Sequence, residues 1–250
     1  MNVIRMLLRM IWRGLFFLNG AITLILLFPA FYVLLLKEAW FPLVFRLKRF
    51  WASLLIGNVG IRCKVMQMPE LDPAKAYVIC PNHSSFLDIV LMYRVFRQYF
   101  HFMGKAELKK VPLFNKFFDR MNILVDRQSI IGSHRAFKRA ADDIDKGISI
   151  AIFPEATIPE CSPQMSRFKN GAFKLAIEKQ IPIIPVVFLD NWHLLPDTKG
   201  KWCKGGPGTS RVIVHKPVST TGLTENDLNQ LKSDVFEIIQ KTLREYKCIP

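Results

Sequence analysis

The longest hydrophobic block lies near the start of the chain. No charged residue occurs from Gly14 to Leu36. A helix from Leu15 to Leu36 spans roughly 33 Å, enough to cross the hydrocarbon core of a bilayer. From Trp40 to Leu55 apolar residues recur at helical spacing and leave basic residues on another face, which is typical of a helix at a membrane interface. We therefore expect residues 1–58 to form a membrane-anchoring helical pair; helices of a soluble core are the alternative.

Farther along, short apolar runs alternate with amphipathic stretches. Strands are expected at residues 76–80, 99–103, 122–125, 148–153, 181–189 and 211–215, and helices at 86–97, 133–146 and 171–178. Residues 196–210 read as a polar loop. This alternation predicts an α/β fold, a mixed, mostly parallel sheet flanked by helices. Residues 59–250 are assigned to one domain, which we expect to keep its site when residues 1–58 are removed.

Positive charge is concentrated beside the hydrophobic block. The chain carries a net charge of +15, and the residues through Lys64 hold nine basic residues against one acid. This placement favours an anionic membrane surface or a phosphorylated substrate, and no nucleic-acid-binding motif accompanies it, so no nucleic-acid partner is expected. Basic residues flank both ends of the block and leave its orientation open. Five scattered cysteines suggest no disulfide framework, which favours a domain facing the reducing cytoplasm.

Candidate chemistry lies in the stretch PNHSSFLD, residues 81–88. Ser85 and Asp88 match a helix capping box, which is a purely structural explanation. The alternative places His83 in the turn and Asp88 inside the helix, where the carboxylate accepts the imidazole Nδ1 proton and leaves Nε2 as a general base. Such a base could activate a substrate hydroxyl for attack on an acyl thioester, with no metal or bound cofactor. The backbone N–H groups that start this helix are the expected oxyanion site.

Other motifs decide between these explanations. Downstream of NHSSFLD come GKAEL from Gly104, NILVDR from Asn122, FPEAT from Phe153, FKNGAFKLA from Phe168 and IPIIPVV from Ile181. In this order and spacing they resemble the 1-acylglycerol-3-phosphate acyltransferase family, the PlsC-type glycerolipid acyltransferases, over about residues 76–190. The resemblance implies a membrane-associated enzyme with catalytic His83 and Asp88. It also implies an acyl-CoA or acyl carrier protein donor.

The FPEAT motif departs from the family pattern at two positions. The resemblance implies that Glu155 and Thr157 orient the acceptor, but Ala156 stands where glycine is usual and Ile158 where arginine is usual. An arginine at position 158 would bind the acceptor phosphate with two parallel hydrogen bonds. Because this chain has Ile158 there, other cations must bind the phosphate. The candidate phosphate ligands are Lys105, Arg127, Arg167 and Lys169.

The expected reaction is acyl transfer to the free hydroxyl of 1-acylglycerol 3-phosphate, which forms phosphatidic acid for phospholipid synthesis. Because Ile158 replaces the usual arginine, another lyso-lipid such as a lyso-aminolipid is an alternative acceptor. A non-catalytic basic membrane-binding protein is the alternative from a different class.

Overall fold

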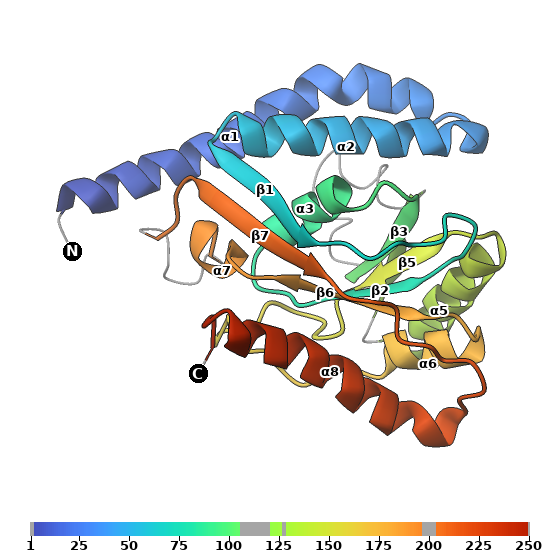
Figure 1. Cartoon of the computed structure of the whole chain (residues 1–250). Helices are drawn as coiled ribbons and strands as arrows, with labels where there is room; N and C mark the ends of the chain where they lie inside the picture. The colour runs from blue at the N-terminus through green and yellow to red at the C-terminus, as the bar shows by residue number, and fades with distance from the viewer. Residues whose placement is uncertain (1–2, 106–120, 127–128, 197–203, 250) are drawn as a thin grey trace.

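A seven-stranded sheet forms the centre of the protein (Figure 1). The structure, a computed structural model, describes residues 3–105, 121–126, 129–196 and 204–249. The strands lie in the order β1-β7-β6-β2-β5-β3-β4, and every neighbouring pair is parallel except β6 and β7. Their bounds are β1 Ile61–Gln67, β2 Val78–Pro81, β3 Phe100–Lys105, β4 Ile123–Val125, β5 Ser149–Ile152, β6 Ile183–Phe188 and β7 Gly208–Val214.

Helices cover both faces of this sheet, which gives two hydrophobic cores (Figure 1). On one face lie α1 Val3–Leu34, α2 Phe41–Gly57 and α3 Leu87–Val95. The other face carries α5 Ile130–Asp145, α6 Gly171–Glu178 and α8 Leu228–Glu245. The short α7 Asn191–Leu194 follows β6, and single 3₁₀ turns, Glu38–Trp40 and Glu225–Asp227, precede α2 and α8.

The predicted fold class is confirmed, and the predicted strands agree with the structure to within a few residues. Three elements were missed: β1, α8 and the four-residue α7. β1 has only Ile61 buried and exposes most other residues, so it lacks the continuous apolar run of a central strand. The helix α8 carries the expected signal, because Leu231, Val235, Ile239 and Leu243 repeat every four residues and are buried. The loop predicted at residues 196–210 ends earlier, since β7 begins at Gly208.

The structure changes the interpretation of α2. Its residues Val44, Phe45, Leu55 and Ile56 are buried in the same core as α3 and β3. The Phe45 ring lies edge-on to Phe100, with 5.2 Å between ring centroids. The apolar residues of α2 therefore divide into two sets: Val44 and Leu55 pack against the domain, while Leu43 and Phe50 are exposed. The division of the chain at residue 58 stays a prediction, and α2 contributes side chains to the core of residues 59–250.

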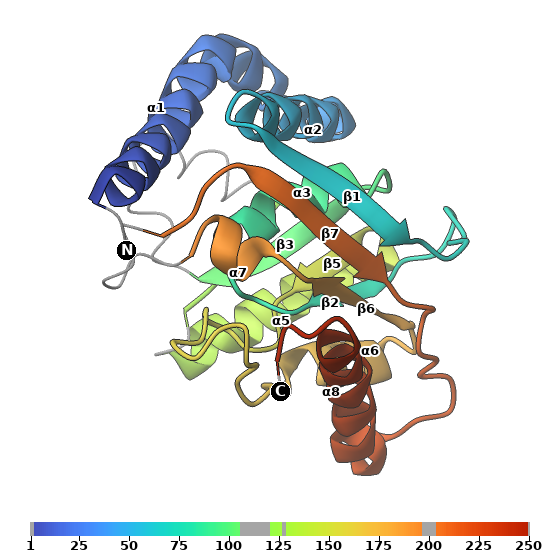
Figure 2. The ribbon, with the colours of Figure 1, turned by 60° about the vertical axis from the view of Figure 1, so that its left-hand side comes forward.

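The long helix α1 contacts the domain near its N-terminal end and α2 along the rest. Arg13 is fully buried and donates a 2.7 Å hydrogen bond to the Pro196 carbonyl, while the Trp12 indole donates to the Val59 carbonyl. Figure 2 shows this half of α1 extending toward α7. In the described part of the chain, α1 alone is long and apolar enough to cross a membrane. Its outward side chains are exposed, among them Leu26 at 72%.

Candidate active site

Five parallel strands, β2 to β6, direct their carboxyl ends to one edge of the sheet, where α/β proteins build their sites. His83 follows β2, Glu155 follows β5 and Asn191 follows β6. Lys105 is the last residue of β3. Because β7 runs in the opposite direction, Ser210 near its start lies at the same edge. Segments distant in sequence therefore meet around the histidine.

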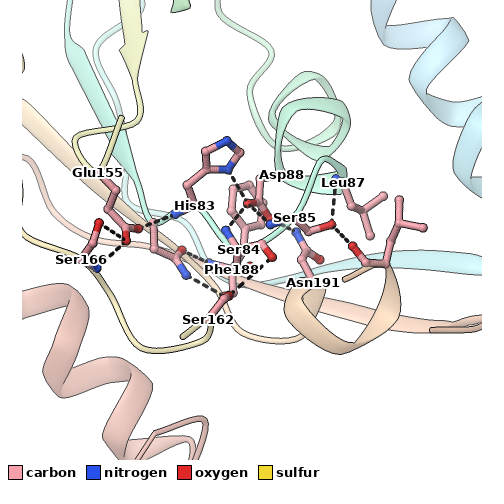
Figure 3. A network of polar contacts seen from close by, with 12 residues as sticks. His83, Ser84, Ser85, Leu87, Asp88, Glu155, Ser162, Ser166, Phe188 and Asn191 are labelled. Carbon is pink, nitrogen blue, oxygen red and sulfur yellow. Dashed lines mark hydrogen bonds and ion pairs between the residues drawn. The ribbon is translucent and has the colours of Figure 1, made fainter. Parts of the chain in front are cut away.

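His83 and Asp88 form the predicted pair. The Nδ1 atom of His83 lies 2.9 Å from Asp88 Oδ2, and the side chains are 11% and 0% exposed. Phe153 stacks on the imidazole with 4.0 Å between ring centroids. Figure 3 shows the imidazole of His83 above the hydrogen-bond network that holds Asp88. No partner for Nε2 is recorded within the described residues. Protonation at Nδ1 therefore leaves Nε2 able to accept a substrate proton.

Asp88 contacts both the turn before α3 and the imidazole of His83, so the structural and the chemical explanations are compatible with one geometry. The helix α3 begins at Leu87, so Asp88 lies in its first turn and His83 lies in the preceding turn. The backbone N–H groups of Ser84 and Ser85 donate to Asp88 Oδ2 at 2.6 and 2.9 Å. These bonds compensate a buried negative charge. They also correct the oxyanion prediction, because both N–H groups are directed at Asp88 and not toward a substrate.

Two asparagines that the sequence did not indicate also hold this edge. Asn82 exchanges two hydrogen bonds with the Phe188 backbone, which fixes the turn of the motif against β6. Asn191 donates from Nδ2 to Asp88 Oδ1 at 2.7 Å. A sequence pattern could have drawn attention to Asn82 because it is part of the NHSSFLD motif. The contact of Asn191 joins residues 103 positions apart and has no local signal.

Glu155 is buried beside the pair and serves the protein's own backbone. Its Oε1 accepts from the His83 N–H at 2.8 Å, and Oε2 accepts from the Ser166 N–H at 2.7 Å (Figure 3). Burial raises the pKa of the Glu155 carboxyl to about 7, against these hydrogen bonds, and the nearby Asp88 charge adds to the rise. Both oxygens accept backbone hydrogen bonds, so Glu155 fixes the histidine loop, and its contact with the acceptor stays a prediction.

The rest of the FPEAT motif explains why glycine is usual at one position. Ala156 has φ of +68°, a left-handed conformation that glycine adopts without strain. A non-glycine residue there costs roughly 1–2 kcal/mol. Thr157 is exposed next to it, and its predicted contact with the acceptor stays a prediction.

Of the four predicted phosphate ligands, the structure describes the side chains of Arg167 and Lys169. Arg127 lies outside the described residues, and of Lys105 only the backbone, at the end of β3, is described. Arg167 and Lys169 are exposed and line a hollow of about 390 Å³ with residues of α8, including Lys232. Neither His83 nor Asp88 lines that hollow. Arg167 does adjoin Ser166, which contacts Glu155.

A second histidine pair was not foreseen from the sequence. His101 on β3 has Nδ1 at 2.8 Å from Asp143 of α5 and Nε2 at 2.7 Å from the Tyr99 hydroxyl. Burial lowers the pKa of His101, against the attraction of Asp143. Since strand side chains alternate and Phe102 lies on the His83 side near Phe153, His101 faces the opposite layer. Among the described residues no group of three or more His, Cys, Asp or Glu could hold a metal.

The raised pKa of Glu155 predicts a pH dependence of stability. A buried carboxyl with pKa of about 7, against an ordinary value of 4.5, binds its proton more tightly in the folded state. Its contribution to the free energy of unfolding is therefore fully present below about pH 4.5 and is lost as the pH rises through 7. We expect the difference in Tm between pH 5 and pH 8 to shrink in Glu155→Gln. An unchanged difference in denaturation scans in detergent would contradict the assigned environment.

Comparison with known proteins agrees with this geometry. The family profile described as Acyltransferase matches residues 62–189. An uncharacterized acyltransferase of Schizosaccharomyces pombe is 31% identical over 191 residues, 75% of this chain and 67% of that protein. A 1-acyl-sn-glycerol-3-phosphate acyltransferase of Saccharomyces cerevisiae is 31% identical over 197 residues, 75% of this chain and 61% of that protein. The chain thus matches about three fifths to two thirds of these two yeast proteins.

The fold has a close structural counterpart. The crystal structure of the 1-acyl-sn-glycerophosphate (LPA) acyltransferase PlsC from Thermotoga maritima superposes with a TM-score of 0.76 at 22% identity, covering 100% of this chain and 99% of that one. The likeness extends over the N-terminal helices as well as the sheet. The profile match over half of the chain and the similarity to the Schizosaccharomyces pombe protein show that this chain belongs to the acyltransferase family.

Proposed function

We propose that the protein transfers an acyl group from a thioester, acyl-CoA or acyl carrier protein, to the free hydroxyl of 1-acylglycerol 3-phosphate and forms phosphatidic acid. The observation that carries this proposal is the His83–Asp88 pair, oriented by a 2.9 Å contact at Nδ1, while no described residue bonds to Nε2. The imidazole accepts the hydroxyl proton as the oxygen attacks the thioester carbonyl, and Asp88 stabilises the imidazolium. When the tetrahedral intermediate collapses, the same proton passes to the departing thiolate. No protein nucleophile is needed.

A membrane location supports a lipid acceptor. The exposed apolar side chains of α1 gather on the helix that also reaches the edge of the active site through Arg13. Asn19 and Thr23 of α1 hydrogen-bond to α2, so α1 lies against its partner over much of its length. We therefore propose that the helical pair rests in one leaflet, with the domain on the cytoplasmic side. Acceptor lipid then reaches the site without leaving the membrane.

The lysophosphatidate headgroup carries up to two negative charges, and leaving it unpaired in a partly desolvated site costs several kcal/mol. We expect Arg127 and Lys105 to bind it, with Arg167 or Lys169 covering for the arginine absent at Ile158. Arg127→Ala should lower kcat/KM for the acceptor roughly 10- to 100-fold, as expected for a lost charge-assisted hydrogen bond. The KM of the donor should change much less.

The matched control is Lys174→Ala, because Lys174 is an exposed cation that pairs with Glu225 and does not line the hollow of Arg167 and Lys169. It should leave acceptor kinetics unchanged. Each variant is assayed in detergent with lysophosphatidate, a lyso-aminolipid and an uncharged lyso-lipid. Two results would refute the assigned acceptor and leave the histidine chemistry in place. One is a preference for either of the latter two lipids. The other is intact lysophosphatidate kinetics in every single alanine variant of Lys105, Arg127, Arg167 and Lys169.

A further inference from the structure

The buried carboxylate of Asp88 is held on both of its oxygens, but only one side belongs to the NHSSFLD motif. Oδ2 contacts His83 and the backbone of the turn. Oδ1 instead accepts a 2.7 Å hydrogen bond from Asn191, the first residue of α7, whose side chain is completely buried. The orientation of the carboxylate plane therefore depends on a residue that follows β6, beyond the segment matched by the family profile.

Asn191 is itself oriented by a further residue. The Ser210 hydroxyl donates a 2.6 Å hydrogen bond to Asn191 Oδ1, and Ser210 is also completely buried. An amide oxygen accepts and an amide nitrogen donates, so this bond keeps the NH₂ group turned toward Asp88. The opposite amide orientation would direct an oxygen at a carboxylate. Ser210, Asn191, Asp88 and His83 thus form one continuous chain of hydrogen bonds, which we call the buried relay.

We propose that Asn191 and Ser210 are positioning residues for acyl transfer: they lock Asp88 in the one orientation that presents Oδ2 to His83 Nδ1. The inference rests on the proposed role of His83 as the base. Neither residue touches the imidazole, so their effect passes through Asp88. The Asn191 donor also shares the carboxylate charge, and this sharing sets how strongly Asp88 stabilises the protonated imidazole.

Replacement of Asn191 therefore has a specific kinetic signature. Asn191→Leu keeps the approximate volume but removes the donor, so more negative charge remains unshared beside His83. We expect kcat to fall about 10- to 100-fold with both KM values within about threefold, as for a lost hydrogen bond to a charged group. The acidic limb of the pH–rate profile should move to higher pH by about half to one unit. Ser210→Ala frees the amide to turn and should lower kcat about three- to tenfold.

Asn191→Asp makes the opposite test. A protonated carboxyl at this position can still donate to Asp88, whereas an ionised one faces a second carboxylate at about the 2.7 Å separation seen for the amide. Two carboxylates at such a distance do not both ionise readily. The variant should therefore retain most activity at low pH and lose it as the pH rises, a change that loss of packing alone would not produce.

The experiment measures kcat, both KM values and Tm from pH 5 to 9 for the full-length wild type and the three variants in detergent. Thr242→Val is the control, because Thr242 is a buried hydroxyl whose bond to His215 lies away from the site. In parallel, the rate at which diethyl pyrocarbonate modifies His83 is followed against pH by peptide mass spectrometry. This readout needs neither acceptor nor donor, so it stands even if lysophosphatidate is the wrong acceptor.

A lower kcat and shifted His83 modification profile in Asn191→Leu, with Thr242→Val unchanged, support the relay. The inference is overturned if folded Asn191→Leu keeps the wild-type kcat and modification profile. The inference is also overturned if activity falls in proportion to Tm in every variant, so that Thr242→Val and the variants at Asn191 and Ser210 follow the same relation. Should Asn191→Leu fail to fold, Ser210→Ala and the pH dependence of Asn191→Asp decide the question by the same criteria.

Discussion

His83→Ala is expected to reduce acyl transfer by at least about 10²- to 10⁴-fold, because the residue acts as the base in attack and returns the proton to the leaving thiolate. The loss should exceed that of a single proton transfer, since both halves of the reaction use the same imidazole. Asp88→Asn should also be severe, because an amide cannot stabilise the imidazolium in the same way.

Folding of the His83→Ala protein is expected to be close to that of the wild type. His83 lies in a turn, and the variant keeps the backbone N–H that donates a hydrogen bond to Glu155. The ring does pack on Phe153, so a Tm decrease of a few degrees is compatible with the mechanism. The matched control is His101→Ala, which removes the other histidine–aspartate pair. Compared with His83→Ala, this control should lower Tm more and kcat less. Near-normal turnover by folded His83→Ala would show that His83 is not the base.

Deletion of residues 1–58 has the second large expected effect. The hydropathy pattern leads us to expect a domain that keeps its site, whereas the burial of α2 leads us to expect loss of folding. Val44, Phe45, Leu55 and Ile56 are buried in the core that also contains Leu91 and Phe100. Burial of a large apolar side chain contributes about 1.5–3 kcal/mol, so four of them contribute roughly 6–12 kcal/mol. Since a domain is stable by only about 5–15 kcal/mol, the remaining chain should not fold.

The measurement is a thermal scan and a detergent-solubility assay of the 59–250 chain. We expect no cooperative unfolding transition. The control separates anchoring from folding: Ile25→Gln with Leu26→Gln alters α1 where side chains are 61% and 72% exposed. That variant should keep its Tm and lose retention on vesicles after a salt wash. A truncated chain that unfolds cooperatively and transfers acyl groups would show that α2 is dispensable.

The fold class was predictable because the central strands are buried on both faces and read as continuous apolar runs, as in β2, β5 and β6. The role of α2 was not predictable in this way. An apolar helix side facing lipid and one facing a protein core have the same pattern, and tertiary contacts such as that of Phe45 with Phe100 distinguish them.

In the site too, local contacts could be predicted from the sequence and long-range contacts could not. His83 and Asp88 lie five residues apart, so one turn of chain brings them together and their motif is visible in the sequence. Asn191 and Ser210 reach Asp88 only after β6 and β7 have joined the sheet, and no local pattern encodes that contact. Glu155 was identified by its motif, but its backbone partners required the fold.

The central claim is that the His83–Asp88 pair transfers an acyl group directly from a thioester to the hydroxyl of lysophosphatidate. The measurement that tests it most directly follows thiol release and phosphatidic acid together, with purified wild type and His83→Ala supplied with palmitoyl-CoA, and separately with palmitoyl-acyl carrier protein, plus lysophosphatidate in detergent. The wild type is predicted to form one phosphatidic acid for each thiol released with at least one donor, and the variant to form neither above background. Thiol release without phosphatidic acid, or equal product from both proteins, would contradict the account.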